Sequence, residues 1–206
     1  MPDSTFDYIS VAKQVILEEA AALHKTSDLL GEDFVKACEW VKGCTGRVVW
    51  IGVGQSWHVA RKTACSMASL GRPSFFIHAT EAVHGDMGLI TNEDIVFLVS
   101  HSGKTKEVLD TLGPIKRIGA RTIALVGKLE SPLAKACDLA LTTGVEQEAG
   151  PIKFAPSSSA LVTTGVGDAL VMAVAQSLGF NEEAYSRYHP GGAIGETLLG
   201  KQDKTS

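Results

Sequence analysis

The chain lacks several features that would assign it to large functional classes. It has no run of basic residues, and its net charge of −4 and pI near 5.9 argue against a nucleic-acid surface. We expect no apolar stretch long enough to span a bilayer, and the amino terminus does not have the layout of a signal peptide. The composition therefore predicts a cytoplasmic protein that binds neither nucleic acid nor membrane.

Metal and nucleotide motifs are also missing. The four cysteines form no CxxC pair or other metal spacing, so we predict reduced core thiols of a cytosolic protein. The Gly52-x-Gly54 turn lacks the third glycine of a dinucleotide fingerprint, because Trp57 occupies that position, and no P-loop pattern exists. No histidine pair has metal-ligand spacing on a helix. We therefore expect no metal and no cofactor.

What the chain does contain is an alternation of apolar segments. Its 206 residues, 45% of them hydrophobic, can form one substantial core. Five short apolar segments without polar alternation are typical of strands covered on both faces, and helical patterns separate them. This predicts an α/β fold, a flavodoxin-like doubly wound sandwich with a five-stranded parallel sheet in which the first and third strands are neighbours. The predicted strands are 47–51, 74–77, 95–99, 122–126 and 138–142.

The ends of the chain are expected to differ from this central domain. Residues 1–43 predict two helices packing on the domain: Ser4 can cap the first, and Gly43 stops the second. A long buried helix is predicted over 157–178, whereas Pro114 makes the second half of the helix after residue 105 uncertain. We expect the domain to cover 44–200 and a disordered tail to follow at 201–206.

Two hydroxyl-rich turns, 52–56 and 100–105, each follow a predicted strand directly. A phosphate group is bound by backbone N–H donors, hydroxyl groups and the positive end of a helix. Because open parallel sheets bind ligands at the carboxyl ends of their strands, the two turns are expected to flank one crevice. Ordinary helix capping is the alternative explanation. The predicted phosphate-binding residues are Gly54, Gln55, Ser56, Ser100, His101, Ser102 and Thr105.

Two carboxylates and two histidines are candidates for catalysis. Glu107 begins the helix after the second turn, where the helix dipole alone would also favour a glutamate. Glu148 follows the fifth strand, in a loop where it could instead be a solvated charge. His84 and His189 lie in glycine-flanked segments, 81–88 and 186–195, and either could have only a packing role.

These segments resemble the sugar isomerase (SIS) domain family, and most closely its arabinose-5-phosphate isomerase branch. The match runs from about residue 10 to residue 199. The Ser100-x-Ser102-Gly103-x-Thr105-x-Glu107 turn is shared by SIS domains in general. The motifs typical of the branch are His84-Gly85-Asp86-Met87-Gly88, Ala155-Pro156-Ser157-Ser158-Ser159, Gly167-Asp168-Ala169-Leu170 and His189-Pro190-Gly191-Gly192-Ala193-Ile194-Gly195.

The resemblance implies isomerisation of D-ribulose 5-phosphate to D-arabinose 5-phosphate by a homodimer or homotetramer, through an enediol intermediate. It places Glu148 as the base, and burial is expected to raise the pKa of this carboxyl toward neutrality. His84 and His189 would shuttle protons or position the substrate, and Glu107 would hold a hydroxyl or assist the second proton transfer. The His189 segment is expected to reach the site of a neighbouring subunit.

Two departures from the family pattern leave alternatives open. The family commonly has Lys where this chain has Gln55, and losing that ammonium would cost roughly 1.5–3 kcal/mol of substrate binding. Members of the branch often continue into paired CBS domains, and this chain ends just after the SIS domain, so we expect no such regulation in cis. The alternatives are a phosphosugar-binding sensor and another isomerase, such as a 3-hexulose-6-phosphate isomerase.

Overall fold

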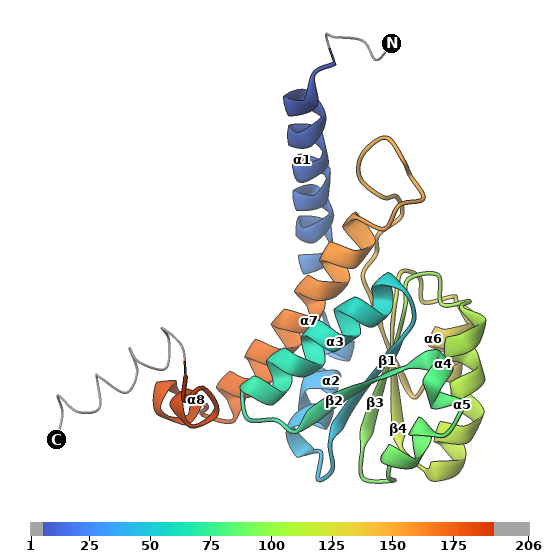
Figure 1. The fold of residues 1–206 in the computed structure, drawn as a ribbon, viewed down its shortest axis with the longest axis vertical. Helices are drawn as coiled ribbons and strands as arrows, with labels where there is room; N and C mark the ends of the chain where they lie inside the picture. The colour runs from blue at the N-terminus through green and yellow to red at the C-terminus, as the bar shows by residue number, and fades with distance from the viewer. Residues whose placement is uncertain (1–5, 192–206) are drawn as a thin grey trace, which may run out of the picture.

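A five-stranded parallel sheet forms the centre of the molecule (Figure 1). The computed structural model describes residues 6–191 of the chain. The strand order is β2-β1-β3-β4-β5, which confirms the predicted flavodoxin-like arrangement with the first and third strands adjacent. The strands are β1 (Val48–Gly52), β2 (Ser74–His78), β3 (Ile95–Ser100), β4 (Arg121–Val126) and β5 (Leu139–Thr142).

Helices cover both faces of the sheet, and each face has its own apolar core. Successive side chains of a strand point to opposite faces, so Val48 and Trp50 enter one core while Val49 and Ile51 enter the other. The first core is closed by α2 (Glu32–Gly43), α3 (Gln55–Ser69) and α7 (Ser158–Ser177). The second is closed by α4 (Ala79–Ala82), α5 (Lys106–Ile118) and α6 (Pro132–Ala136). A short 3-10 helix, η1 (Asp86–Leu89), follows α4, and α8 (Glu182–Tyr188) follows α7.

Two helices differ from the sequence expectations. Helix α5 continues through Pro114, which resolves the uncertainty about its second half. Buried Leu112 and Ile115 flank the proline in the second core, so tertiary packing offsets the loss of the backbone hydrogen bond that proline cannot make.

Helix α7 is long and apolar enough, by length and composition, to cross a membrane, so the expectation that no stretch would reach that length is wrong. Its buried side chains, Val162 and Leu170 among them, belong to the first core.

Helix α1 (Tyr8–Ser27) projects beyond the body of the molecule (Figure 1). Its N-cap is Asp7, whose side chain accepts a hydrogen bond from the Ser10 amide, so the expectation that Ser4 caps it is wrong. Apolar side chains along the helix are largely uncovered, with Ile9 and Ile16 each 65% exposed. The helix is instead joined to the domain at its carboxyl end, where the buried Thr26 hydroxyl donates to the Thr143 carbonyl at 2.5 Å.

The four cysteines, Cys38, Cys44, Cys65 and Cys137, are free thiols, as predicted. Three are half-buried, and burial raises the pKa of the Cys137 thiol to about 11. Cys65 is exposed on α3, so the expectation that all four are core residues is wrong for this one.

Candidate active site at the switch point

A cavity of about 300 Å³ opens at the carboxyl ends of β1 and β3. Its walls come from the amino-terminal turns of α3, α5 and α7 and from the loop that connects β5 to α7. We call it the switch-point pocket, because the strand order reverses at β1 and β3. It is lined by Val53, Gln55, Ser56, Val59, His101, Ser102, Thr105, Glu148, Phe154, Pro156, Ser159, Ala160 and Thr163.

The first hydroxyl-rich turn leads from β1 into α3. Gly54 is the N-cap of α3 and supplies no side-chain cap, so the first amide groups of the helix are left for a ligand. Gln55 and Ser56, the next two residues, line the pocket, whereas Gly54 itself does not. The turn thus offers backbone donors and one hydroxyl at the wall of the cavity.

The second turn is shaped by a buried hydroxyl. Ser100 is 2% exposed; its Oγ lies 2.8 Å from Thr105 Oγ1 and accepts a hydrogen bond from the Gly103 amide at 3.1 Å. Gly103 has φ +59°, and a Cβ there would overlap the Ser131 side chain. Ser100 therefore supports the turn from behind, while Ser102 and Thr105 reach the pocket wall.

His101 lines the pocket with its ring lying against Gly127. Its Nδ1 is buried and has no hydrogen-bond partner within residues 6–191. Sequence reasoning selected His101 only as part of the phosphate turn; the structure places its side chain at the cavity as well.

Glu148 faces the pocket from the loop after β5 and is bound by the start of α7. Its Oε2 accepts hydrogen bonds from the amides of Ser157 and Ser159, each at 2.9 Å, and from Ser157 Oγ at 3.2 Å. Burial raises the pKa of Glu148, but the hydrogen bonds from Ser159 and Ser157 outweigh it and the pKa is lowered. The expectation of a raised pKa is therefore wrong: the helix amides hold this carboxyl as an anion.

Three other predicted residues lie outside the pocket wall in this chain. Glu107, in the first turn of α5, has an exposed side chain and is not among the lining residues. His84 is exposed in the turn between α4 and η1. Neither lines the cavity, although each follows an element that ends near the carboxyl edge of the sheet.

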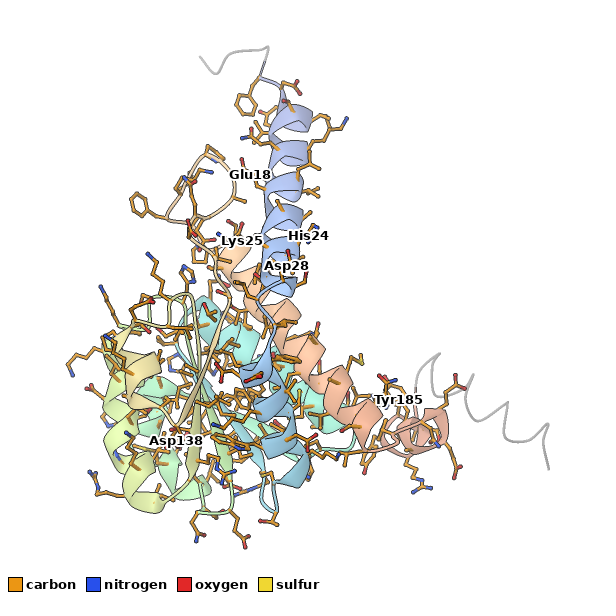
Figure 2. All side chains as sticks on the ribbon, turned by 180° about the vertical axis from the view of Figure 1, so that it is seen from behind. Glu18, His24, Lys25, Asp28, Asp138 and Tyr185 are labelled. Atoms are coloured by element: carbon orange, nitrogen blue, oxygen red, sulfur yellow. The ribbon has the colours of Figure 1, made fainter. Side chains whose placement is uncertain are left out.

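His189 lies at the far end of the molecule. It is the C-cap of α8, where its ring stacks on Tyr185 with centroids 3.7 Å apart. Tyr188 of the same helix lies near Gly71, past the end of α3, whereas the start of α3 lines the pocket. The 15 residues of α3 span about 22 Å, so His189 does not reach the pocket of its own chain. Figure 2 shows the neighbouring Tyr185 far from the loop after β5.

The structure also adds residues that the sequence did not identify. Ser159 and Thr163, both buried on α7, line the cavity, and Phe154 and Pro156 form its wall on the loop. The hydroxyl-rich start of the helix at 157–159 was the available signal for Ser159. The wall formed by the loop depends on its tertiary path, which no local pattern indicates.

The pocket has few charges. Among its lining residues, Glu148 and His101 are the titratable ones, and no lysine or arginine is present. Gln55 lines the pocket with an exposed side chain. Within residues 6–191, no group of three or more His, Cys, Asp or Glu side chains could hold a metal ion.

Comparison with known proteins identifies the family. Residues 44–173 match the SIS domain. The chain is 47% identical over 193 residues to arabinose 5-phosphate isomerase KdsD of Pseudomonas aeruginosa, covering 94% of this chain and 59% of that protein. It is 43% identical over 196 residues to arabinose 5-phosphate isomerase GutQ of Escherichia coli, with 94% and 60% covered. The chain therefore spans about three fifths of the length of these curated relatives.

A solved structure agrees over nearly its whole length. E. coli CFT073 c3406 in complex with arabinose 5-phosphate has a TM-score of 0.86 and 40% identity, covering 88% of this chain and 97% of that chain. The parallel sheet and its strand order, the hydroxyl-rich turns at the switch point and the family match agree with one another. The chain belongs to the SIS domain family.

Proposed function

We propose that this protein is an aldose–ketose isomerase that interconverts D-ribulose 5-phosphate and D-arabinose 5-phosphate without a metal or cofactor. The observation that carries the proposal is a hydrogen-bonded Glu148 carboxylate in the same pocket as two amino-terminal helix turns. A phosphate suits the helix turns, and a proton acceptor suits the carbon end of the substrate. The arabinose 5-phosphate complex of a structural neighbour with 40% identity supports the same ligand class.

The phosphate end is proposed to bind where α3 and α5 begin. Ser56, Ser102 and Thr105 would donate hydroxyl hydrogen bonds, and Ser100 would hold the turn in place. Gly54 would leave the first amides of α3 without a side-chain cap. His101 and Gln55 would add further hydrogen-bond donors. Because no lysine or arginine lines the pocket, the two helix dipoles and these donors would stabilise the dianion.

Glu148 is proposed to take the proton that moves between C1 and C2. Ser157 and Ser159 bind Oε2, so Oε1 is the oxygen that receives none of these three bonds and would face the substrate carbon. Removal of that proton gives an enediolate, and return of the proton to the neighbouring carbon completes the isomerisation. A carboxylate with a lowered pKa is ionised throughout the neutral range, so a base is always available.

The remaining roles are proposed for Glu107, His84 and His189. Glu107 lies two residues after Thr105, in the first turn of α5, and would contact a sugar hydroxyl or assist the second proton transfer. His84 and His189 would exchange protons with the oxygens or position the sugar. Because His189 lies away from the pocket of its own chain, this role requires a homodimer or homotetramer in which a second copy supplies it. We place the assembly in the cytoplasm, with residues 1–43 as helices on a domain of 44–200.

A second candidate is a phosphosugar sensor without catalysis, favoured by Gln55 and by the lack of a basic residue in the pocket wall. One experiment separates the two functions. Purified protein is supplied with D-ribulose 5-phosphate, and formation of D-arabinose 5-phosphate is followed alongside the Glu148→Gln variant. Turnover that the variant loses supports the isomerase. Tight binding of the sugar phosphate by a wild-type protein without turnover would overturn it in favour of the sensor.

A further inference from the structure

The loop that connects β5 to α7 carries Glu148, yet it has no helix or strand of its own. It covers residues 143–157 and also supplies Phe154 and Pro156 to the pocket wall. Phe154 is 96% exposed, so the outer part of the loop has little packing of its own. The position of Glu148 must therefore depend on contacts made elsewhere along the loop.

Helix α1 supplies such contacts on both sides of Glu148. Two residues before it, Glu146 Oε1 accepts a hydrogen bond from Lys25 Nζ at 2.8 Å. Two residues after it, the Gly150 amide donates to Glu18 Oε2 at 2.8 Å. Glu18 and Lys25 are seven residues apart, which places them on one face of the helix. Figure 2 labels both on the flank of α1 beside the loop.

Of the two contacts, the one at Glu18 is made to the backbone of the loop, whereas the one at Lys25 is made to a loop side chain. Gly150 is buried and has φ +79°, and a Cβ there would lie 3.1 Å from Val15 Cγ2 of α1. Glu18 Oε2 also pairs with Lys153 Nζ at 3.3 Å. A buried amide requires an acceptor, and the helix rather than the loop provides it.

An inner set of bonds joins the same stretch to the start of α7. The Ala149 amide donates to Ser157 Oγ at 2.8 Å, and Ser157 Oγ lies 3.2 Å from Glu148 Oε2. Glu148, Ala149 and Gly150 are therefore held by α7 on the pocket side and by α1 on the outer side. Without the outer bond, this stretch would be held on the pocket side by α7 alone.

We propose that Glu18 is a positioning residue, which fixes the Gly150 amide and so holds the Glu148 carboxylate at its place in the pocket. The inference rests on the proposed isomerase function. Exposed ion pairs contribute little to stability, so the value of this contact is expected in turnover rather than in the folded state as a whole. A displacement of about 1 Å at a reacting group is enough to lower a rate by roughly a hundredfold.

The test compares three variants of the full chain. Glu18→Ala removes the acceptor. Glu18→Gln keeps a carbonyl oxygen for the Gly150 amide but loses the charge that faces Lys153. Glu19→Ala is the matched control, because Glu19 is the next residue of α1 and its side chain makes no hydrogen bond or ion pair within residues 6–191. Each variant is assayed for kcat, KM and the pH dependence of kcat, and its loop is followed by amide hydrogen exchange.

We expect Glu18→Ala to lower kcat roughly ten- to a hundredfold with little change in KM, since the phosphate turns are untouched. Its acidic limb should move to higher pH, because a displaced Glu148 loses the amides that hold it ionised. Peptides from residues 146–157 should exchange faster. Glu18→Gln and Glu19→Ala should stay close to wild type in kcat, KM, pH dependence and hydrogen exchange.

A kcat for Glu18→Ala equal to that of Glu19→Ala, or unchanged exchange in the loop, would overturn the inference. A lower melting temperature with an unmoved acidic limb would also overturn it, because that is the signature of a purely structural contact. Failure of the proposed function has a different signature. Wild-type protein would then show no turnover, which removes the catalytic role of Glu18, while the exchange data would still show whether Glu18 holds the loop.

Discussion

The sheet has a carboxylate beside a cavity at each of its two ends. At the amino ends of the strands, Asp94 borders a cavity of about 370 Å³. Its Oδ1 accepts from the Arg47 amide at 2.6 Å, and its Oδ2 accepts from the Thr91 amide at 2.8 Å. Arg47 Nη2 lies 3.4 Å from Oδ2 as well. At the carboxyl ends, Glu148 Oε2 alone accepts from the Ser157 amide, the Ser157 hydroxyl and the Ser159 amide.

Both carboxyl groups have a lowered pKa, and in both the hydrogen bonds outweigh the effect of burial. The difference lies in what remains available. Asp94 is 1% exposed with both oxygens occupied, whereas Glu148 is half-buried, lines the switch-point pocket, and accepts the bonds from the Ser157 amide, the Ser157 hydroxyl and the Ser159 amide on Oε2 alone. A cavity and an ionised carboxylate therefore do not by themselves make a site. A reactive position also needs a carboxylate that is accessible from the cavity.

The largest effect is expected from Glu148→Gln. The amide cannot accept the substrate proton, so kcat should fall by about a thousandfold. It keeps a carbonyl oxygen for the Ser157 and Ser159 amides, so the melting temperature should change little. Steady-state kinetics and thermal unfolding measure the two effects, with Glu130→Gln at an exposed glutamate as the control. Near-normal turnover in Glu148→Gln would remove this residue as the base.

Asp94, at the amino ends of the strands, is expected to affect stability rather than turnover. Asp94→Ala leaves the amides of Arg47 and Thr91 without an acceptor, which should lower the free energy of unfolding by roughly 3 kcal/mol. Turnover measured well below the melting temperature should stay near wild type. Because the pKa of Asp94 is lowered in the folded protein, its stabilisation is present above the unfolded pKa and is lost as the pH falls through the folded one.

Urea denaturation at several pH values checks the second half of that prediction. Wild-type stability should decline as the pH falls below about 4, near the ordinary pKa of an aspartate. Asp94→Ala should show a smaller decline. An equal decline in both proteins would mean that another carboxyl group carries the acid sensitivity.

A smaller effect is expected where the pocket lacks charge. Gln55→Lys adds an ammonium at the start of α3, and KM for the sugar phosphate should fall about tenfold, since an added charge-assisted hydrogen bond contributes roughly 1.5 kcal/mol. Gln55→Met is the control, because it keeps the length of the side chain without its donors. An unchanged KM in Gln55→Lys would show that residue 55 does not reach the phosphate.

The smallest effect is expected from Ser159→Ala. The Ser159 side chain and amide both lower the pKa of Glu148, and this variant removes the side-chain contribution alone. The acidic limb of kcat should shift to higher pH, while kcat at neutral pH stays nearly unchanged because Glu148 is still ionised there. A pH–rate profile measures the shift, and a profile identical to wild type would mean that the amides alone keep Glu148 ionised.

Much of the domain could be read from local patterns. Strands such as 95–99, which the structure extends to Ser100, are short apolar runs that only a covered parallel sheet accommodates. Their turns carry the glycines and hydroxyl residues that open the next helix. Helix α6 was missed, because its five residues, Pro132–Ala136, are too short for a helical period to appear. The first helix was predicted, but the sequence did not indicate which of its residues contact the rest of the molecule. Apolar Ile16 is exposed, while polar Glu18 contacts the loop.

The site shows the same division. Ser56, Ser102 and Thr105 were identified because each lies one turn from the end of a strand, and position along the chain determines that placement. The pKa of Glu148 was predicted in the wrong direction. Burial of a loop glutamate could be guessed, but the amides of Ser157 and Ser159 reach it from the next helix. The orientation of these amides toward Glu148 depends on how the loop 143–157 turns back to the start of α7.

Local sequence patterns were enough to predict the order of the strands, the positions of the two hydroxyl-rich turns and the family to which the chain belongs. These follow from residue periodicity and from short motifs, which act within one or two turns of chain. The tertiary structure was needed to show which of the candidate residues share a pocket, how the Glu148 carboxylate is bonded, and that α1 contacts the loop on both sides of Glu148. The contacts of α1 join residues more than a hundred positions apart, such as Glu18 and Gly150, and no local pattern encodes them.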